Sequence, residues 1–313
     1  MKKYMTLIII SLLTMFSLVA CGSSTTGNES EGSVSSENNK GKITVGGKDF
    51  TEQQILSKIT SIYLKENGYE IEEASNMGST VVRSALENGQ IDVYWEYTGT
   101  GLVVYLKQEV ETDPNAAYKK VKELDKENGL TWLNKAAFNN TYAMLMKQEK
   151  ADELGIETLS DLANYVVNNP NELKFASNAE FYAREDGIKG LQKHYGFEFP
   201  AKNVVKMDSG LLYNALKDGQ VDVSVGFATD GRIKGFNLVS LEDDKFFFPA
   251  YNAAPVVTQD VIEKNSEVSD LLNDISEKLD TETMMSLNYR VDVEYEGVSA
   301  VARDWLKSQG LIK

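Results

Sequence analysis

Aromatic side chains gather at the end of one predicted strand. The stretch QIDVYWEYTGTGL, residues 90–102, places Tyr94, Trp95 and Tyr97 around a single carboxylate, Glu96. A small, flexible run of Thr and Gly follows directly. The face of an aromatic ring attracts a cation by about 0.5–2 kcal/mol, and the cation needs no hydrogen-bonding proton. Rings at the edge of a sheet therefore indicate a site for a positively charged small molecule. Core packing with a satisfied hydroxyl is the alternative for Tyr97 taken alone.

The elements that position these rings occur twice in the chain. Residues 77–93, MGSTVVRSALENGQIDV, and residues 207–223, MDSGLLYNALKDGQVDV, share eight identities in 17 positions. Each copy predicts a short helix with a serine near its start, a glycine where it ends, and then an apolar strand. Chance similarity within one large α/β domain is the alternative to a true repeat.

The segments around the two copies predict an α/β fold. Strands are expected at 42–47 and 173–177, and a helix is expected after residue 50. Thr51 and Gln54 are spaced as a capping box at the start of that helix. Both halves then run strand, helix, strand, helix, strand, which favours parallel sheets covered by helices. We expect two similar lobes with a cleft between them.

The repeat also predicts where a ligand binds. In open α/β sheets, ligands lie beyond the carboxyl ends of the strands. Tyr97 follows one repeated strand, and Phe227 follows the other at the matching position 130 residues later. Thr100 and Asp230 match in the same way. We therefore expect rings from both lobes to face one cleft.

The inventory of reactive side chains argues against most catalytic sites. His194 is the one histidine in the sequence and Cys21 is the one cysteine. His-based triads, Cys–His pairs and the usual zinc sites need more of these residues. No phosphate-binding G-x-x-x-x-G-K-[ST] run occurs either. We expect no metal, no cofactor and no enzymatic activity.

Carboxylates leave one enzymatic alternative open. Glu96, Asp92 and Glu180 could supply the acid pair of an extracellular hydrolase. Asp92 and Asp222, however, both follow Gly-Gln in the two repeat copies. A residue that recurs in this way points to a structural role.

The N-terminus predicts export and lipid attachment. Residues 1–20 have two lysines followed by an apolar run, the layout of a secretory signal. Residues 18–21, LVAC, resemble a bacterial lipobox, which implies cleavage before Cys21 and a diacylglycerol on its sulfur. An ordinary signal peptide with an incidental cysteine is the alternative. Residues 21–41, rich in Ser, Gly, Asn and Glu, predict a flexible tether. The expected location is the cell membrane, with the protein anchored on its extracytoplasmic face.

The charge of the chain excludes nucleic acid as a main partner. Without Lys2 and Lys3 the mature chain has 30 basic and 47 acidic residues, so its formal charge is 30 minus 47, or −17. A polyanion without a basic patch does not bind another polyanion.

Five motifs identify a family resemblance that runs from about residue 42 to the C-terminus. They are GGKDFTEQ (46–53), NMGSTVVRSALENGQIDVYWEYTGT (76–100), FNNTYAM (138–144), EFYAREDG (180–187) and FATDGRI (227–233). Together they resemble the substrate-binding lipoproteins of glycine betaine/carnitine/choline (osmoprotectant) ABC importers. The resemblance implies a two-lobed, type II periplasmic-binding-protein-like (venus flytrap) fold. It also implies a receptor that closes on its ligand and delivers it to a membrane permease driven by an ATPase.

In this family an aromatic cage holds a trimethylammonium group. The resemblance places the cage at Tyr97, Tyr142, Phe227 and Tyr251. Phe227 stands where relatives carry Tyr, so the ring is kept and a hydroxyl is lost. Tyr94 and Trp95 are not part of the implied cage, and Trp95 is expected to pack behind it.

The resemblance also implies residues for the carboxylate end of a betaine. They are Lys48, Gln53, Thr100 and Arg184, with Asn140 and Glu180 in supporting positions. For Lys48 and Arg184, ion pairs between the lobes with Glu180 or Asp49 are the alternative. Thr100 can donate to a carboxylate, whereas an acid at this position would favour choline. We expect glycine betaine and carnitine to bind better than choline.

The expected boundaries follow from the crossings between the lobes. Lobe I is predicted at 42–138 plus 249–313 and lobe II at 139–248, and the C-terminal run 298–312 is expected to pack on lobe I as an amphipathic helix. We expect a monomer. The rival functions are the extracellular carboxylate-dependent hydrolase and a surface sensor or adhesin.

Overall fold

The computed structural model describes residues 40–313, which lie within one compact unit. The predicted signal peptide, Cys21 and almost all of the tether lie outside the described residues. Within residues 40–313, no helix is both long and apolar enough to cross a membrane.

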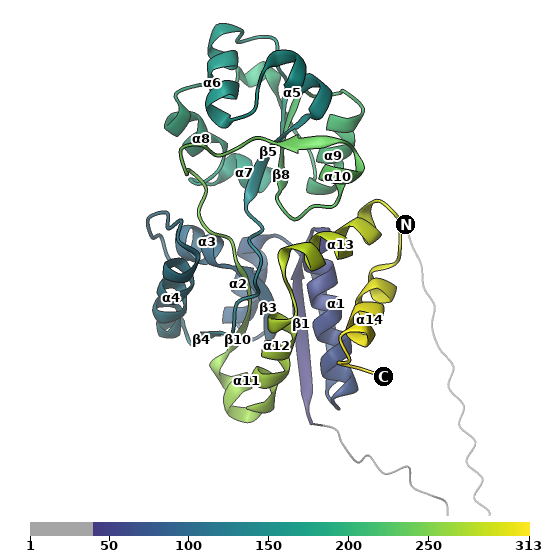
Figure 1. Ribbon diagram of the computed structural model, residues 1–313. Coiled ribbons are helices and arrows are strands. Elements are labelled where there is room, and N and C mark those ends of the chain that lie inside the picture. Colours follow the sequence, from purple (N-terminus) through teal and green to yellow (C-terminus); the bar gives the residue numbers. More distant parts are fainter. Residues whose placement is uncertain (1–39) are drawn as a thin grey trace, which may run out of the picture. The chain divides into compact units, whose positions relative to one another are not determined.

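The first lobe is built on a five-stranded sheet ordered β2-β1-β3-β10-β4 (Figure 1). Its strands are β1 (Lys42–Lys48), β2 (Glu70–Met77), β3 (Val93–Tyr97), β4 (Leu130–Trp132) and β10 (Ala253–Thr258). Its helices are α1 (Thr51–Glu66), α2 (Ser79–Glu87), α3 (Thr98–Thr100), α4 (Pro114–Leu124), α11 (Gln259–Lys264), α12 (Glu267–Glu277), α13 (Thr281–Asp292) and α14 (Val298–Ser308), with a π-helical turn at Gly101–Tyr105 and a 3-10 turn at Asp125–Asn128.

The second lobe is built on a sheet ordered β7-β6-β8-β5-β9. Its strands are β5 (Tyr142–Lys147), β6 (Phe175–Ser177), β7 (Val204–Lys206), β8 (Val223–Phe227) and β9 (Leu238–Ser240). Its helices are α5 (Gln148–Leu154), α6 (Leu159–Asn168), α7 (Ala179–Ala183), α8 (Ile188–Tyr195), α9 (Ser209–Lys217) and α10 (Arg232–Gly235), with a 3-10 turn at Ala201–Asn203.

The two sheets have the same plan. In each, three neighbouring strands are parallel, and a fourth, β10 or β5, is antiparallel to the strand that ends in Tyr97 or Phe227. Both sheets are therefore mixed, with the parallel strands that the sequence indicates and an antiparallel strand beside them. The physical reason is the chain path: β5 and β10 each enter their sheet directly from the other lobe, so they arrive from the cleft side and run the opposite way.

The helices of the repeat end as the sequence predicts. Helix α2 ends at Glu87, and Gly89 two residues later has φ +65°. Helix α9 ends at Lys217, and Gly219 has φ +70°. A left-handed backbone costs glycine little, so both helices stop at the same point of the repeat.

Asp92 and Asp222 have the repeated structural role that their positions indicate. One carboxylate oxygen of Asp92 accepts a hydrogen bond from the backbone N–H of Thr44 at 2.7 Å. Asp222 accepts from the backbone N–H of Lys174 at 2.8 Å. Each acid thus holds the start of one repeated strand against the parallel strand beside it, at the end of the sheet away from the rings.

Helix α1 starts at Thr51, but without the expected capping box. Phe50 is the N-cap residue and makes no side-chain cap hydrogen bond. The hydroxyl of Thr51 donates to Asp292 at 2.7 Å, and the amide of Gln54 donates to Asn76 at 3.3 Å. Both side chains are therefore taken by residues distant in sequence, which a local motif does not reveal.

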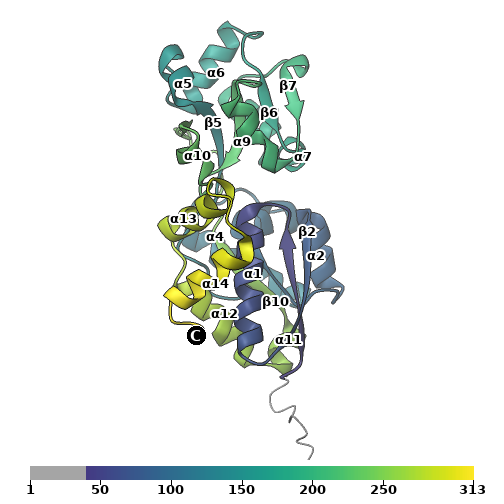
Figure 2. The same ribbon diagram turned by 90° about the vertical axis from the view of Figure 1, so that its right-hand side faces the viewer.

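Two extended segments join the lobes, as Figures 1 and 2 show. Asn139 and Asn252 form an isolated antiparallel bridge between them. The backbone N–H of Asn140 donates to the carbonyl of Tyr251 at 3.1 Å. All strands of the first sheet lie in the ranges predicted for lobe I, and all strands of the second lie in the range predicted for lobe II. The residue at which one lobe passes into the other stays a prediction.

The C-terminal helix packs on the first lobe, as expected. Helix α14 lies along α1 and α13 (Figure 2). Val301, Trp305 and Leu306 are buried on its inner face. This packing fixes α1, whose first turn faces the cleft between the lobes.

Candidate functional site

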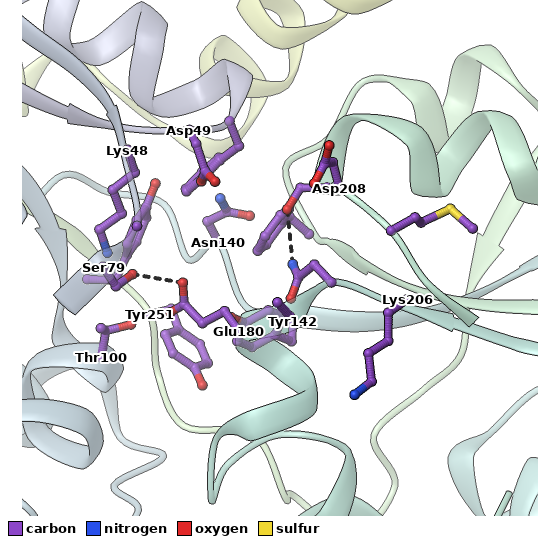
Figure 3. A pocket seen from close by; sticks show the side chains of 18 residues that line it. Lys48, Asp49, Ser79, Thr100, Asn140, Tyr142, Glu180, Lys206, Asp208 and Tyr251 are labelled. Atoms are coloured by element: carbon purple, nitrogen blue, oxygen red, sulfur yellow. Dashed lines mark hydrogen bonds between the residues drawn. The ribbon is translucent and has the colours of Figure 1, made fainter. Parts of the chain in front are cut away.

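A cavity of about 390 Å³ lies at the carboxyl ends of the strands of both sheets. Figure 3 shows its lining side chains, which come from both lobes and from the crossing segments. The lining consists of Lys48, Asp49, Phe50, Gly78, Ser79, Tyr97, Thr100, Asn140, Tyr142, Asn178, Ala179, Glu180, Lys206, Met207, Asp208, Ser209, Phe227 and Tyr251.

All four rings of the predicted cage line this cavity. Tyr97 ends β3, Phe227 ends β8 and Tyr142 begins β5, directly opposite Phe227 in the antiparallel pair. The ring centroid of Tyr142 lies 5.4 Å from that of Phe227 and 5.5 Å from that of Tyr251, which it meets edge to face. The structure thus brings together four rings that are up to 154 residues apart (251 minus 97) in the sequence.

A fifth ring, Phe50, was missed in the sequence. Its ring stacks on Phe227 at a centroid distance of 5.0 Å and lies 6.2 Å from that of Tyr97. Phe50 follows strand β1, so the rule that ligands bind beyond the ends of the strands could have found it. It bridges the lobe I ring and the lobe II ring.

Tyr97 is held by a buried polar network behind the cavity. Its hydroxyl donates to a carboxylate oxygen of Glu52 at 2.7 Å and accepts from the amide of Gln53 at 3.1 Å. Burial raises the pKa of Tyr97 well above the usual value, so the phenol keeps its proton. Gln53, predicted at the carboxylate end of a ligand, is fully buried and does not line the cavity.

Residues 98–100 have small side chains, and the ring of Tyr251 packs against them at Gly99. A side-chain carbon at Gly99 would lie 2.8 Å from the ring of Tyr251. Only glycine permits this approach. The hydroxyl of Tyr251 donates to Asp186, so both the ring and its hydroxyl end are fixed.

Lys48 lines the cavity and pairs with Glu96 at 2.6 Å, with both side chains almost fully buried. Its ammonium also lies 5.2 Å from the ring centroid of Tyr97. Glu96 accepts further hydrogen bonds from the hydroxyls of Tyr94 at 3.0 Å and Tyr105 at 2.9 Å. The partner of Lys48 is thus neither Asp49 nor Glu180.

Trp95 packs behind the site, as expected. It is fully buried among the residues that cover the sheet, and its indole N–H donates to Thr60 of α1 at 2.9 Å. Of Tyr94, Trp95 and Tyr97, only Tyr97 lines the cavity. Tyr94 orients Glu96, and Trp95 anchors the strand.

Arg184 lies just behind the lining rather than on it. Its guanidinium makes two hydrogen bonds to Asp186, at 2.7 and 2.5 Å, and one to Glu180 at 2.9 Å. It also donates to the hydroxyls of Thr100 at 3.2 Å and Tyr251 at 3.4 Å. The ion pair with Glu180 lies within lobe II, four residues away, so it is not the pair between the lobes that the sequence left open.

Polar contacts join the lobes around the cavity. Ser79 of lobe I donates to Glu180 of lobe II at 3.0 Å, the contact drawn in Figure 3. Arg184 of lobe II reaches Thr100 of lobe I in the same way. Asn140, on a crossing segment, donates to Glu52 at 2.9 Å.

The starts of two helices that line the cavity were not predicted, although the repeat contained a signal. Gly78 and Ser79 line the cavity from the start of α2, and Asp208 and Ser209 line it from the start of α9. These pairs stand at matching positions of the two copies, 130 residues apart. Lys206 adds a cation on the side of Asp208, across the cavity from Ser79 (Figure 3).

The chemistry of the lining suits binding. Among residues 40–313, no group of three or more His, Cys, Asp or Glu side chains is arranged to hold a metal ion. Of the acids considered for a hydrolase, Glu180 lines the cavity, whereas Glu96 lies behind it and Asp92 at the other end of the sheet.

Comparison with known proteins identifies the family. The family model for the substrate binding domain of ABC-type glycine betaine transport systems matches residues 41–308. A glycine-betaine-binding protein of Pseudomonas aeruginosa is 43% identical over 275 residues, which cover 86% of this chain and 88% of that protein. The carnitine transport binding protein OpuCC of Listeria monocytogenes is 35% identical over 312 residues, covering 98% and 96%.

A solved structure agrees with the predicted fold. The crystal structure of a glycine betaine/carnitine/choline ABC transporter protein superimposes with a TM-score of 0.70 at 30% identity, over 87% of this chain and 99% of that one. The two-lobed α/β fold expected from the sequence is confirmed. The chain belongs to the family of substrate-binding domains of ABC-type glycine betaine transport systems.

Proposed function

We propose that this chain is the extracytoplasmic receptor of an ABC importer and that it captures quaternary-ammonium osmolytes such as glycine betaine and carnitine. The observation that carries the proposal is the convergence of four rings from both lobes on one cavity. The methyl groups of a quaternary ammonium favour apolar contact, and its charge favours the negative faces of the rings. Water gains little in such a site.

In the proposed pose the trimethylammonium lies between Tyr97, Tyr142, Phe227 and Tyr251. The carboxylate end points to Lys48 and to the hydroxyl of Thr100, both of which line the cavity. Arg184 supports this end through its hydrogen bond to Thr100 rather than by reaching the ligand first. Its distance from the lining is the reason for this change from the predicted role.

The same pose gives a preference among ligands. Thr100 offers a neutral hydroxyl, which can donate to the carboxylate of a zwitterion. Choline has no carboxylate, so it gains nothing from the ammonium of Lys48 or from the hydroxyl of Thr100. We therefore rank glycine betaine and carnitine above choline.

Delivery and location complete the proposal. The bonds from Ser79 to Glu180 and from Arg184 to Thr100 join the lobes beside the ligand, so they would favour the closed receptor that a permease recognises. We propose that the receptor is a monomer anchored through a lipid on Cys21. The anchor is a prediction for residues outside the described range.

Carboxylate-dependent hydrolysis is the weaker candidate. Glu96 forms an ion pair with Lys48 and accepts hydrogen bonds from two tyrosine hydroxyls. Asp92 accepts a hydrogen bond from the backbone N–H of Thr44. Neither has a free position beside the cavity, and Glu180, which lines it, is paired with Arg184 at 2.9 Å. The matching family model describes the substrate binding domain of a transport system.

The test is calorimetric titration of the full chain, purified in detergent, with glycine betaine, carnitine and choline. We expect saturable binding of the two zwitterions, weaker binding of choline and recovery of unchanged ligand. Absence of binding by all three would refute the proposal. Turnover of a ligand would favour the enzymatic alternative, and choline binding at least as tightly as glycine betaine would refute the preference.

A further inference from the structure

We propose that Glu52 supplies the negative charge that complements a bound quaternary ammonium, and that it acts through the hydroxyl of Tyr97 as a positioning residue. This inference rests on the proposed function, because it concerns the charge of the ligand. Glu52 does not touch the ring cavity itself. Its effect on the ligand must therefore pass through Tyr97 and through the electric field.

Glu52 lies in the first turn of α1 and is only 2% exposed. One carboxylate oxygen accepts from the hydroxyl of Tyr97 at 2.7 Å and from the amide of Asn140 at 2.9 Å. The other accepts from the hydroxyl of Thr229 and from the amide of Asn288 at 3.4 Å. Four donors converge on two oxygens, which is the arrangement of an ionised carboxylate.

All four partners of Glu52 are uncharged, and this sets it apart from every other buried acid in the described part of the chain. The buried carboxylates among residues 40–313 are Glu52, Glu96, Asp125, Asp186 and Asp230. The buried cations are Lys48, Arg83, Arg184 and Arg232. Each cation pairs with one acid: Lys48 with Glu96, Arg83 with Asp125, Arg184 with Asp186, and Arg232 with Asp230. Within this range Glu52 alone is left without a cation.

Among the buried groups of residues 40–313, the count leaves one negative charge, that of Glu52, without a protein cation to match it. Burial raises the pKa of Glu52, because an isolated buried charge is unfavourable, whereas the hydrogen bonds from its four donors favour the ionised form and oppose this shift. A quaternary ammonium in the ring cavity would supply the missing positive charge. The low dielectric of the surroundings strengthens that attraction over the distance between them.

Tyr97 is the route by which the charge reaches the cage. A phenol that donates its proton to a carboxylate carries more electron density on its ring, so its face attracts a cation more strongly. The hydroxyl of Tyr97 makes this bond to Glu52. Glu52 also accepts from Thr229, which follows β8 in the second lobe. The carboxylate that polarises the ring therefore also holds the lobes together.

The test compares a cation with its uncharged isostere. Glycine betaine and 3,3-dimethylbutanoate have the same shape, but the latter carries a tert-butyl group in place of the trimethylammonium. We expect Glu52→Gln in the full chain to lower the affinity for glycine betaine about tenfold in calorimetry, which is the scale of one cation–π contact. The affinity for the isostere should fall by less than about threefold, because Gln keeps the size of the Glu52 side chain and one acceptor oxygen.

Two further variants assign the effect. Glu66→Gln makes the same charge change at the exposed end of the same helix, where Glu66 pairs with Arg303, and should leave both ligands unaffected. Tyr97→Phe keeps the ring and the buried charge but removes the bond between them. Glu52→Gln should add little in the Tyr97→Phe background if the charge acts through the hydroxyl. This variant also keeps the test decisive if Glu52→Gln does not fold.

The outcomes separate the inference from the proposed function. If the unmodified protein binds no glycine betaine, the proposed function fails. If it binds glycine betaine and Glu52→Gln weakens both ligands equally, Glu52 is a structural residue and the inference is wrong. Full additivity with Tyr97→Phe would contradict the route through the hydroxyl.

Discussion

Tyr97 and Phe227 end matching strands in the two lobes, yet the two rings are held in different ways. Hydrogen bonds to Glu52 and Gln53 fix the hydroxyl of Tyr97. Phe227 has no hydroxyl, and its ring is fixed by stacking on Phe50 at 5.0 Å and by contact with Tyr142 at 5.4 Å. One repeated unit thus delivers a ring to the cleft twice, once through a polar network and once through ring packing.

This difference indicates unequal contributions to binding. A ring that is hydrogen-bonded to a buried carboxylate is both rigid and electron-rich. A ring held by stacking shares its faces with its neighbours, so a smaller part of it is available to a ligand. We expect lobe I to contribute most of the cation binding and lobe II to complete the enclosure.

Alanine substitutions of the two rings should have the largest effects on ligand affinity. Tyr97→Ala should lower the affinity for glycine betaine about 100-fold, because one cation–π contact and the order of the polar network are both lost. Phe227→Ala should lower it about tenfold. Titration followed by intrinsic fluorescence measures both. A larger loss for Phe227→Ala would reverse the assignment of the lobes.

Thr100 and Asp230 form a second matched pair, and Thr100→Asp makes the lobes alike at this position. In lobe II, Asp230 pairs with Arg232 at 2.6 Å. An acid at residue 100 would repel the carboxylate of glycine betaine, so affinity should fall about tenfold, while choline should bind as well or better. Calorimetry with both ligands checks this. Equal losses for the two would mean that Thr100 does not face the carboxylate.

Asp292 tests the contact between the lobes near α10 and α13. Burial raises its pKa to about 6, and the pair with Arg232 at 3.4 Å only partly offsets that effect. Its folded pKa exceeds the unfolded one, so stability should fall as pH rises through about 4 to 6. Asp292→Asn should therefore stabilise the protein by about 1–2 kcal/mol at pH 8.

Thermal unfolding at two pH values provides the measurement for Asp292→Asn. The gain at pH 8 should shrink towards zero at pH 4.5, where the native acid is protonated. A gain that is the same at both values would assign the effect to packing.

Asp92→Ala and Asp222→Ala test a structural role that the two lobes share. Each removes one charged hydrogen bond to the backbone at the start of a parallel strand. We expect each to lower the free energy of unfolding by about 1 kcal/mol, since both carboxylates are partly exposed. Glycine betaine affinity should not change. A loss of affinity on Asp92→Ala with unchanged stability would reopen the hydrolase reading.

Phe227→Tyr should have the smallest effect. The added hydroxyl restores the residue type that the family resemblance implies at this position. The ring of Phe227 is held by stacking on Phe50 and not by a hydrogen bond, so affinity should change by less than about threefold. A tenfold gain in calorimetry would mean that a hydroxyl here finds a partner and that the lobes are more alike than their networks indicate.

The sequence revealed the parts of the site that are repeated or that end strands. Tyr97 and Phe227 stand at equivalent positions, so the repeat and the strand-end rule predicted both together. Asp92 and Asp222 were assigned a structural role on the same grounds. Periodic and repeated features are local in sequence, and their consequences can be worked out without knowing the packing.

The rest depends on contacts that only the folded chain creates. The carboxylate of Glu52 accepts hydrogen bonds from Thr229 and Asn288, which are 177 and 236 residues away. Lys48 meets Glu96 because β1 and β3 are neighbours in the sheet. The capping box was wrong because Asp292, 241 residues away, takes the hydroxyl of Thr51. No local pattern contains this information.

The most direct test of the account is a crystal structure of the protein with glycine betaine. We predict that the trimethylammonium nitrogen lies within about 6 Å of the ring centroids of Tyr97, Tyr142, Phe227 and Tyr251, with the carboxylate towards Lys48 and Thr100. A ligand bound away from these rings, for example in the adjoining chamber lined by Asp230 and Asp292, would contradict it.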